Sequence, residues 1–326
     1  MNILIDCMGG DNAPEAVVAG VKKASKEFGE KITLLGLEQK ISPLVRKYGI
    51  ENAEIINTSD NISAGENALH AIKSKRDSSM VVGLSMLRQG KGDAFVSAGN
   101  TGALIGAATL FARRIKGVKR IALSPIMPTK HGATILIDAG ANVDYNPEFL
   151  AQFAIMGEVY MKKVHDVAEP RIGLLNVGSE DGKGHAAARE TFALLKNMPI
   201  NFVGNIEARD LAEHACDVLV TDGFTGNVLL KTLEGVASMM NFYLKQAINL
   251  NPSTKFAGIL LKDALTEMQA RVDYSQYGGA PVLGANGTVI KAHGSSSPEA
   301  FYHAIRQAIA FHKTGVNAEI SRVFAS

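Results

Sequence analysis

The hydrophobic pattern alternates between two kinds of segment over about the first two thirds of the chain. Short continuous apolar runs are typical of buried strands; they lie at 2–6, 32–37, 54–57, 93–96, 121–127, 134–138, 171–176, 201–203 and 217–221. Between them, segments with apolar residues at helical spacing predict helices at 14–28, 38–48, 65–75, 79–89, 103–115, 147–164, 184–196 and 207–214. Strands that alternate with helices in this way form a mostly parallel sheet covered on both faces, an α/β/α architecture. A polar turn at 129–132 also predicts one antiparallel hairpin.

The last third of the chain departs from this alternation. A long helical region at about 227–272 is broken at 249–254, which predicts two helices that join at a tip and project from the sheet domain. A glycine-rich tail at 274–298 follows, and then a last helix. Without an internal repeat, low-complexity tract or linker in the sequence, residues 1–326 are expected to form a single catalytic domain. The helical projection would serve dimerisation and contact with a membrane.

Composition narrows the classes of function. The chain has 326 residues, of which 46% are hydrophobic and 20% charged, as is typical of a soluble globular protein. Its formal net charge of +2 is too small to favour nucleic acid as a partner. The two cysteines have no metal-ligand spacing, the apolar runs are too short to span a membrane, and the first residues predict a strand rather than a signal peptide. We therefore expect a cytoplasmic protein.

The segment at 92–115 carries the sharpest chemical signal. A short buried strand ends in Ser-Ala-Gly-Asn-Thr-Gly, and a helix follows at once. This arrangement leaves unpaired backbone N–H groups at the positive end of the helix dipole, which favours an anion and most often phosphate. Ordinary helix capping is the alternative, although it needs fewer glycines and polar side chains. The predicted phosphate site is Ser97, Gly99, Asn100, Thr101 and Gly102.

Four other polar, glycine-bearing loops follow predicted strands, at 6–11, 138–142, 176–184 and 222–227. Ligands of an open parallel sheet bind beyond the carboxyl ends of its strands, so these loops together predict one polar crevice. The loop at 178–184 nearly matches a nucleotide P-loop, but it is one residue short between its glycines and lacks the hydroxyl residue after Lys183. ATP or GTP hydrolysis is therefore not expected. Lys183 is either a point charge for phosphate or a solvated loop lysine.

Neither a cofactor nor a metal is predicted. The dinucleotide fingerprint G-x-G-x-x-G follows none of the predicted strands, and the acids form no metal-ligand cluster in the sequence. His185 and His293 are acid–base or oxyanion candidates, although a lone histidine is more often structural. Cys7, directly after the first strand, could by itself be taken for a nucleophile.

Several motifs, taken in order, point to one family. They are Asp6-x-Met8-Gly9-Gly10-Asp11, Ser97-Ala98-Gly99-Asn100-Thr101-Gly102, the run Leu175 to Gly184, the run Thr221 to Asn227, and Tyr277-Gly278-Gly279-Ala280-Pro281 with His293-Gly294-Ser295-Ser296. Over essentially the whole chain they resemble the bacterial acyl-carrier-protein:phosphate acyltransferases, the PlsX family. The one departure is Cys7, where members of the family often carry Ala, and this argues against a cysteine nucleophile.

The resemblance implies a fold related to phosphotransacetylases and to isocitrate and isopropylmalate dehydrogenases, and it implies a homodimer. It further implies that inorganic phosphate attacks the thioester of a fatty acyl carrier protein. The product, acyl phosphate, is the acyl donor for the first membrane step of phospholipid synthesis. Because phosphate is already an anion, such a site must supply placement, oxyanion donors and stabilisation of the departing thiolate rather than a nucleophilic triad.

Residue chemistry suggests roles within this reaction. The turn at 97–102, helped by Lys183, would hold phosphate; Asn176, Asn227 and His293 are oxyanion or orienting candidates; Asp222 would orient a donor or relay a proton. Three alternatives remain. They are a coenzyme A-dependent short-chain phosphotransacetylase, a dehydrogenase on the same fold, and a non-enzymatic membrane scaffold that binds carrier protein. The missing cofactor fingerprint disfavours the dehydrogenase, and a scaffold would leave the polar loops unexplained.

Two surface features suggest macromolecular partners. Five cations lie within eight residues after the helix that begins at the phosphate turn: Arg113, Arg114, Lys116, Lys119 and Arg120. They are either a docking patch for the acidic carrier protein or favourable charge at a helix end.

The second feature is an apolar tip beyond the helical break, formed by Phe256, Ile259, Leu260 and Leu261. Because lysines flank it, the tip predicts weak, reversible binding to an anionic membrane, where a downstream membrane acyltransferase would collect the product. The alternative for the apolar stripe at 256–268 is a core or a dimer interface.

Overall fold

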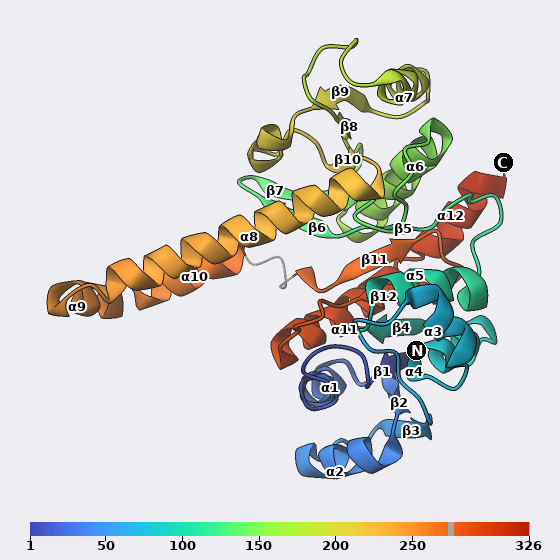
Figure 1. Cartoon of the computed structure of the whole chain (residues 1–326), viewed down its shortest axis with the longest axis vertical. Helices are drawn as coiled ribbons and strands as arrows, with labels where there is room; N and C mark the ends of the chain where they lie inside the picture. The colour runs from blue at the N-terminus through green and yellow to red at the C-terminus, as the bar shows by residue number, and fades with distance from the viewer. Residues whose placement is uncertain (273–276, 326) are drawn as a thin grey trace.

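The computed structural model describes residues 1–272 and 277–325 (Figure 1). Their strands form two mostly parallel sheets, ordered β3-β2-β1-β4-β12-β11-β5 and β6-β7-β10-β8-β9. The larger sheet contains β1 (Asn2–Asp6), β2 (Lys31–Gly36), β3 (Ala53–Asn57), β4 (Ala94–Ser97), β5 (Ala122–Leu123), β11 (Ala280–Leu283) and β12 (Thr288–Lys291). The smaller sheet contains β6 (Ile126–Thr129), β7 (Gly132–Ile137), β8 (Ile172–Leu175), β9 (Phe202–Ile206) and β10 (Val218–Val220).

Helices flank both sheets, so the predicted α/β class is confirmed. Those of the first half are α1 (Glu15–Phe28), α2 (Glu38–Tyr48), α3 (Ala68–Ser74), α4 (Ser79–Arg88), α5 (Thr101–Ala107), the π-helical η1 (Ala108–Ala112) and α6 (Pro147–Val164). Those of the second half are α7 (Ala186–Lys196), the 3₁₀-helical η2 (Ala208–Glu213), α8 (Gly223–Ile248), α9 (Pro252–Leu260), α10 (Lys262–Val272), α11 (Pro298–Lys313) and α12 (Val316–Ala325). The predicted antiparallel hairpin is also confirmed, because β6 pairs with β7 around its turn.

The larger sheet is built around β1, which lies between β2 and β4 and runs parallel to both. Side chains alternate between the two faces of a strand. Ile3 and Ile5 therefore pack with α1 and α11 on one face, whereas Leu4 packs with α4 on the other. All three are fully buried, as a parallel strand covered on both faces requires. This packing fixes the carboxyl end of β1 beside that of β4.

The glycine-rich tail predicted at 274–298 contains two strands that the sequence pattern did not indicate, β11 and β12. Each is only four residues long, and the turn between them uses Gly284 and Gly287 at φ of 83° and 143°, so the glycines masked the strand signal. β12 pairs in parallel with β4 and sets Lys291 beside Ser97. Positions 274–276 of the predicted tail lie outside the described residues.

Two predicted boundaries were wrong for physical reasons. The helix expected at 103–115 passes into η1 and ends at Ala112, because the next residue, Arg113, has a φ of 67° that is incompatible with a continuing helix. The single strand expected at 121–127 is two strands, because the chain leaves the larger sheet after β5 and enters the smaller one at β6. This crossing places 124–125 between the strands of the two sheets.

A helical arm extends from the sheets in Figure 1, with α9 at its far end, and residues of α8 line one cavity together with Met268 of α10. α8 begins at Gly223, earlier than the predicted 227, because the side chain of Asp222 caps its first turn. The predicted break lies between α8 and α9, where Asn251 and Thr254 form a reciprocal capping box. None of the residues 252–260 is buried.

Candidate active site

Two adjoining cavities, of 320 and 500 Å³, lie at the carboxyl ends of β1, β4 and β12. We call them together the cleft. Its walls also include the end of β7 and the first turns of α8, so both sheets contribute. The two cavities share five lining residues: Thr101, Gly102, Lys231, Lys291 and His293. The predicted phosphate turn therefore meets three basic side chains from β12, the loop after it, and α8.

A buried carboxylate, that of Asp6, holds the turn at 97–102 in place. Asp6, 2% exposed, accepts hydrogen bonds of 2.6 Å from the hydroxyls of Ser97 and Ser79. The Ser97 oxygen in turn accepts the N–H of Gly99 at 3.0 Å. The loop after β1 approaches so closely that a Cβ on Gly9 would lie 2.6 Å from the Gly99 nitrogen. Ser97 thus fixes the shape of the turn, and its hydroxyl is already engaged.

Asn100 connects the turn to the loop between β3 and α3, which forms one wall of the larger cavity. Its Oδ1 accepts the N–H of Ala103 at 2.9 Å and caps α5, while its Nδ2 donates to the carbonyl of Ala64 at 2.7 Å. Since both ends of the amide are used, Asn100 serves first to hold the wall against the turn. Gly99, Thr101 and Gly102 lie in the cleft beside it.

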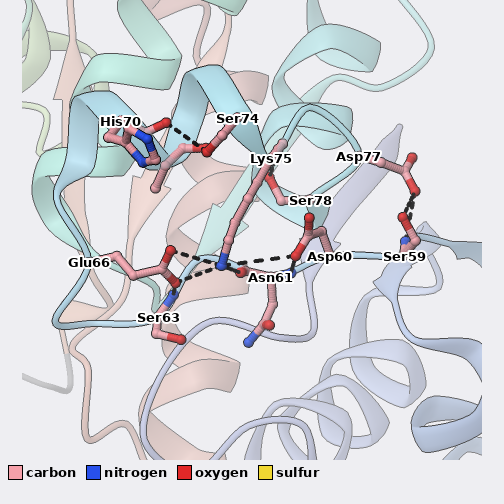
Figure 2. Close-up of polar contacts among 11 residues, drawn as sticks. Ser59, Asp60, Asn61, Ser63, Glu66, His70, Ser74, Lys75, Asp77 and Ser78 are labelled. Carbon is pink, nitrogen blue, oxygen red and sulfur yellow. Dashed lines mark hydrogen bonds and ion pairs between the residues drawn. The ribbon is translucent and has the colours of Figure 1, made fainter.

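Figure 2 shows how the wall loop is held in place. Lys75 points toward it and donates at 2.8 Å both to the carbonyl of Asn61 and to the carboxylate of Glu66. Glu66 also accepts the N–H of Ser63 at 2.7 Å. These bonds lower the pKa of Glu66, the contact with Lys75 contributing most. Hydrogen bonds and an ion pair of Lys75 and Glu66 therefore hold the wall loop in place.

Lys291 is a functional candidate that the sequence pattern missed. It is only 8% exposed, donates to the carbonyl of Ala292 and lies 3.4 Å from that of Ala98. Burial, together with the nearby charge of Lys231, lowers its pKa to about 8. A buried cation at the edge of a cleft attracts anions strongly, because little water screens it. The available signal was a lysine that ends the short apolar run 288–290, as Ser97 ends 94–96.

His293 and Lys231 face the cleft from two different elements. The His293 ring contacts the Ser295 hydroxyl through Nδ1 at 2.8 Å, and its Nε2 lies 3.9 Å from a carboxylate oxygen of Glu234. Burial lowers the pKa of His293, so the ring is neutral at neutral pH and able to donate one hydrogen bond. Lys231 pairs with Glu234 at 2.8 Å one turn along α8. Lys231 is the second basic residue that the sequence pattern missed.

The other predicted catalytic residues divide between two places. Asn227 lines the smaller cavity, and Asp222 caps α8 by accepting the N–H of Thr225 at 3.0 Å. Asn176 and Lys183 belong to a separate exposed loop and line neither cavity of the cleft. Asn176 donates at 3.2 Å to the carbonyl of Lys183, whose ammonium lies 3.5 Å from Glu180. Of the predicted polar loops, the one at 176–184 thus stands apart from the cleft.

The remaining candidates from the sequence do not line the cleft. His185 caps α7 and packs edge-on against Tyr145. Cys7 is fully buried, and burial raises the pKa of its thiol well above the ordinary value, so it is a poor nucleophile. The five cations at 113–120 are all exposed, although Lys119 pairs with Glu148. Within residues 1–272 and 277–325, no group of three or more His, Cys, Asp or Glu residues is placed to hold a metal ion.

Comparison with known proteins places this geometry in a family. A family model described as "Fatty acid synthesis protein" matches residues 1–319. A phosphate acyltransferase of Thermoanaerobacterium thermosaccharolyticum is 45% identical over 99% of this chain and 96% of its own. One of Geobacillus thermodenitrificans is 47% identical over 94% of each chain. Among solved structures, a phosphotransacetylase from Streptococcus pyogenes aligns with a TM-score of 0.63 at 19% identity, over 96% of this chain and 94% of its own.

A second structure shares the fold at still lower identity. The 4-hydroxythreonine-4-phosphate dehydrogenase of Klebsiella pneumoniae aligns with a TM-score of 0.55 at 11% identity, over 95% of this chain and 98% of its own. The predicted relation to phosphotransacetylase-like and dehydrogenase-like folds is thereby confirmed. At such identities the likeness concerns the fold alone.

The relatives define the chain as an enzyme of the acyltransferase class, so the scaffold alternative is not supported. The chain belongs to the fatty acid synthesis protein family and is similar over nearly its whole length to the two phosphate acyltransferases above, so the resemblance seen in the sequence motifs is confirmed.

Proposed function

We propose that this enzyme transfers a fatty acyl group from acyl carrier protein to inorganic phosphate, and that its acyl phosphate product enters phospholipid synthesis. One observation carries the proposal. The glycine-rich turn at 97–102 meets the buried Lys291, the exposed Lys231 and the half-buried His293 in a single cleft. Backbone N–H groups together with cationic side chains are the ordinary means of binding phosphate. The names of the relatives support phosphate as the acyl acceptor.

The chemistry needs placement more than activation. Hydrogen phosphate, held by the turn and Lys291, attacks the thioester carbonyl with one oxygen, so a C–O bond forms and the C–S bond breaks. Its own proton balances the departing thiolate, which leaves as a thiol. A donor placed at the developing oxyanion is worth about 10²–10³ in rate. We assign that role to neutral His293 or to Asn227, and an orienting role to Asp222, while Asn176 and Lys183 stay predictions of the sequence.

The proposal includes macromolecular partners. We infer that the protein is a cytoplasmic homodimer that docks acyl carrier protein through Arg113, Arg114, Lys116, Lys119 and Arg120. These side chains are exposed, so they are available to an acidic partner. The alternative interpretation of these cations is favourable charge at a helix end. It applies less well, because the helix ends at Ala112 and Arg113, the first of the five, lies beyond it.

We also propose reversible contact between the arm and the membrane that holds the downstream acyltransferase. Phe256, Ile259, Leu260 and Leu261 are between 53% and 71% exposed at the end of the arm. Apolar side chains so exposed gain free energy when they enter a lipid interface. Among the described residues no helix is long and apolar enough to cross a membrane.

The experiment that tests the activity incubates the purified protein with an acyl carrier protein thioester and phosphate, and traps acyl phosphate with hydroxylamine. We expect trapping that requires both enzyme and phosphate. The shared fold keeps a coenzyme A-dependent short-chain phosphotransacetylase as the second candidate. Acyl-coenzyme A is therefore offered as donor in parallel. Phosphate-dependent product from acyl-coenzyme A alone would favour the second candidate, and no product from either donor would contradict both.

A further inference from the structure

An apolar groove of 620 Å³ runs beside α8, outside the polar cleft. Strand β6 and the turn after it form one side, and α8 with a residue of α10 forms the other. Its apolar lining consists of Met127, Pro128, Ala212, Leu233, Val236, Ala237, Met240, Leu244 and Met268. Of these, Leu233, Val236, Met240 and Met268 are between 36% and 61% exposed. Such a row of exposed apolar side chains marks a binding surface.

The groove is continuous with the cleft. Glu234 lines both, and on β6 the cleft residue Ile126 is followed directly by the groove residue Met127. On α8 the lining positions 230, 234, 237, 241 and 244 recur every three or four residues, so cleft and groove share one face of the helix. From 230 to 244 that face extends about 21 Å at 1.5 Å per residue. This is the length of a long aliphatic chain, not of an acetyl group.

The two ends of this continuous path differ in chemistry. The cleft end holds Lys231, Lys291 and His293, which suit an anionic or strongly polar head group. Beyond Glu234 the lining is mainly apolar, with methionines whose flexible side chains adapt to an irregular ligand. A ligand that matches both ends has a polar head and a long hydrocarbon tail.

We propose that this groove binds the fatty acyl chain of the substrate and gives the enzyme its preference for long chains, with Ala237 as a specificity-determining position. The inference rests on the proposed function, because it takes the cleft as the place where the acyl carbonyl reacts. Each methylene that an apolar surface removes from water contributes up to about fourfold in affinity. A long chain therefore gains from the groove what a short chain, confined to the cleft, does not.

The test fills the groove without touching the cleft. Ala237 is half-buried on the groove face of α8, and Ala237→Trp would occupy the space beside Met127. We expect this variant to lose at least about tenfold in kcat/KM for palmitoyl carrier protein and less than about twofold for butyryl carrier protein. Ser238→Trp is the matched control, since the next residue on the helix is exposed and lines none of these cavities. It should keep the wild-type ratio.

The outcomes separate the groove from the activity. If Ala237→Trp makes acyl phosphate from both donors at the wild-type ratio, the groove assignment is wrong while the proposed function stands. If the ratio is unchanged and the variant instead dissociates from a dimer on gel filtration, a second copy of the chain occupies the groove. If wild-type enzyme makes no acyl phosphate from any donor, the proposed function itself fails.

A second measurement needs no variant and covers the case in which Ala237→Trp does not fold. Wild-type enzyme is photolysed with palmitoyl carrier protein that carries a diazirine on the terminal carbon. We expect cross-links on β6 and on α8 near Met240 and Leu244. Cross-links confined to the end of the arm at 256–261 would overturn the proposal.

Discussion

The cleft and the helical arm depart from ordinary burial in opposite directions. In the cleft a lysine is 8% exposed and its supporting carboxylate, Asp6, is 2% exposed. On the arm, Leu260 is 71% exposed and Phe256 63%. Charged groups are seldom buried and large apolar groups seldom cluster on a surface, because both arrangements cost free energy. Each region therefore points to a ligand, but of a different kind: an anion for the cleft and a lipid surface for the arm.

This contrast teaches that the two regions are separable. The cleft depends on the strand ends of the two sheets, whereas none of the residues 252–260 at the end of the arm is buried. A change at the end of the arm should leave the chemistry intact, and a change in the cleft should leave membrane contact intact. Variants that change one region while the property of the other is measured test this separation.

The largest effect is expected from Lys291→Met. Loss of the buried cation should lower kcat/KM for phosphate by at least about 100-fold, since a charge placed at the reacting centre contributes that much. The thermal midpoint of unfolding should stay the same or rise, because methionine fills similar space without the desolvation cost of a buried ammonium. Steady-state kinetics and calorimetry measure the two. If the thermal midpoint of unfolding fell sharply together with kcat/KM, Lys291 would be a structural residue rather than a phosphate ligand.

Next comes the double change Leu260→Glu and Leu261→Glu on the arm. Removal of two exposed apolar side chains should weaken binding to anionic vesicles by at least about tenfold, while activity in solution stays unchanged. Vesicle sedimentation measures the binding. Gln246→Glu with Ser253→Glu adds the same charge to exposed polar positions of the arm and should bind nearly as wild type. Inactive monomers in place of active, released protein would assign the stripe to the dimer interface.

The pH dependence of the cleft should follow Lys291. Its pKa is lowered to about 8, so the ammonium is present below that pH and is lost above it. We expect kcat/KM for phosphate to fall about tenfold for each pH unit above 8, whereas vesicle binding through the arm should show no such step. The same pH series on Lys291→Met should lack the step. A profile in the variant that matches the wild type would show that another group titrates.

The smallest effect is expected from the basic stretch after η1. Reversal of charge in Arg113→Glu with Arg114→Glu should raise KM for acyl carrier protein about threefold at low salt, and the effect should fade as salt screens the patch. Lys40→Glu with Arg46→Glu makes the same change in net charge on exposed positions of α2. Equal KM values for the two double variants would show that the stretch at 113–120 is only a solvated surface.

Local pattern was enough for much of the fold and only part of the site. β1, α2 and α6 lie where apolar periodicity placed them, because each buries one continuous face or stripe. The strands β11 and β12 were not predicted, because glycines interrupt such short apolar runs. Lys291 was not identified either, because its burial becomes evident only when β12 is paired with β4.

The two glycine-rich loops show the same limit from the other side. In the sequence, 97–102 and 178–184 look alike as phosphate loops. The first is held by buried Asp6 and meets the cations of the cleft, whereas the second is exposed and pairs with itself through Lys183 and Glu180. They differ in the neighbours that the tertiary fold supplies, such as Lys291, which pairs with Ser97 although the two lie 194 positions apart in the chain.

The central claim, that the cleft binds phosphate through its buried cation, is tested most directly by titration of inorganic phosphate into two variants that lose the same charge. Lys291→Met removes the lysine of the cleft, and Lys183→Met removes the lysine of the exposed loop. Followed by isothermal calorimetry at neutral pH, phosphate should bind Lys291→Met at least about tenfold more weakly than the wild type, and Lys183→Met nearly as well as the wild type. Unchanged binding in Lys291→Met, with the loss in Lys183→Met instead, would contradict the claim and move the phosphate site to the loop at 178–184.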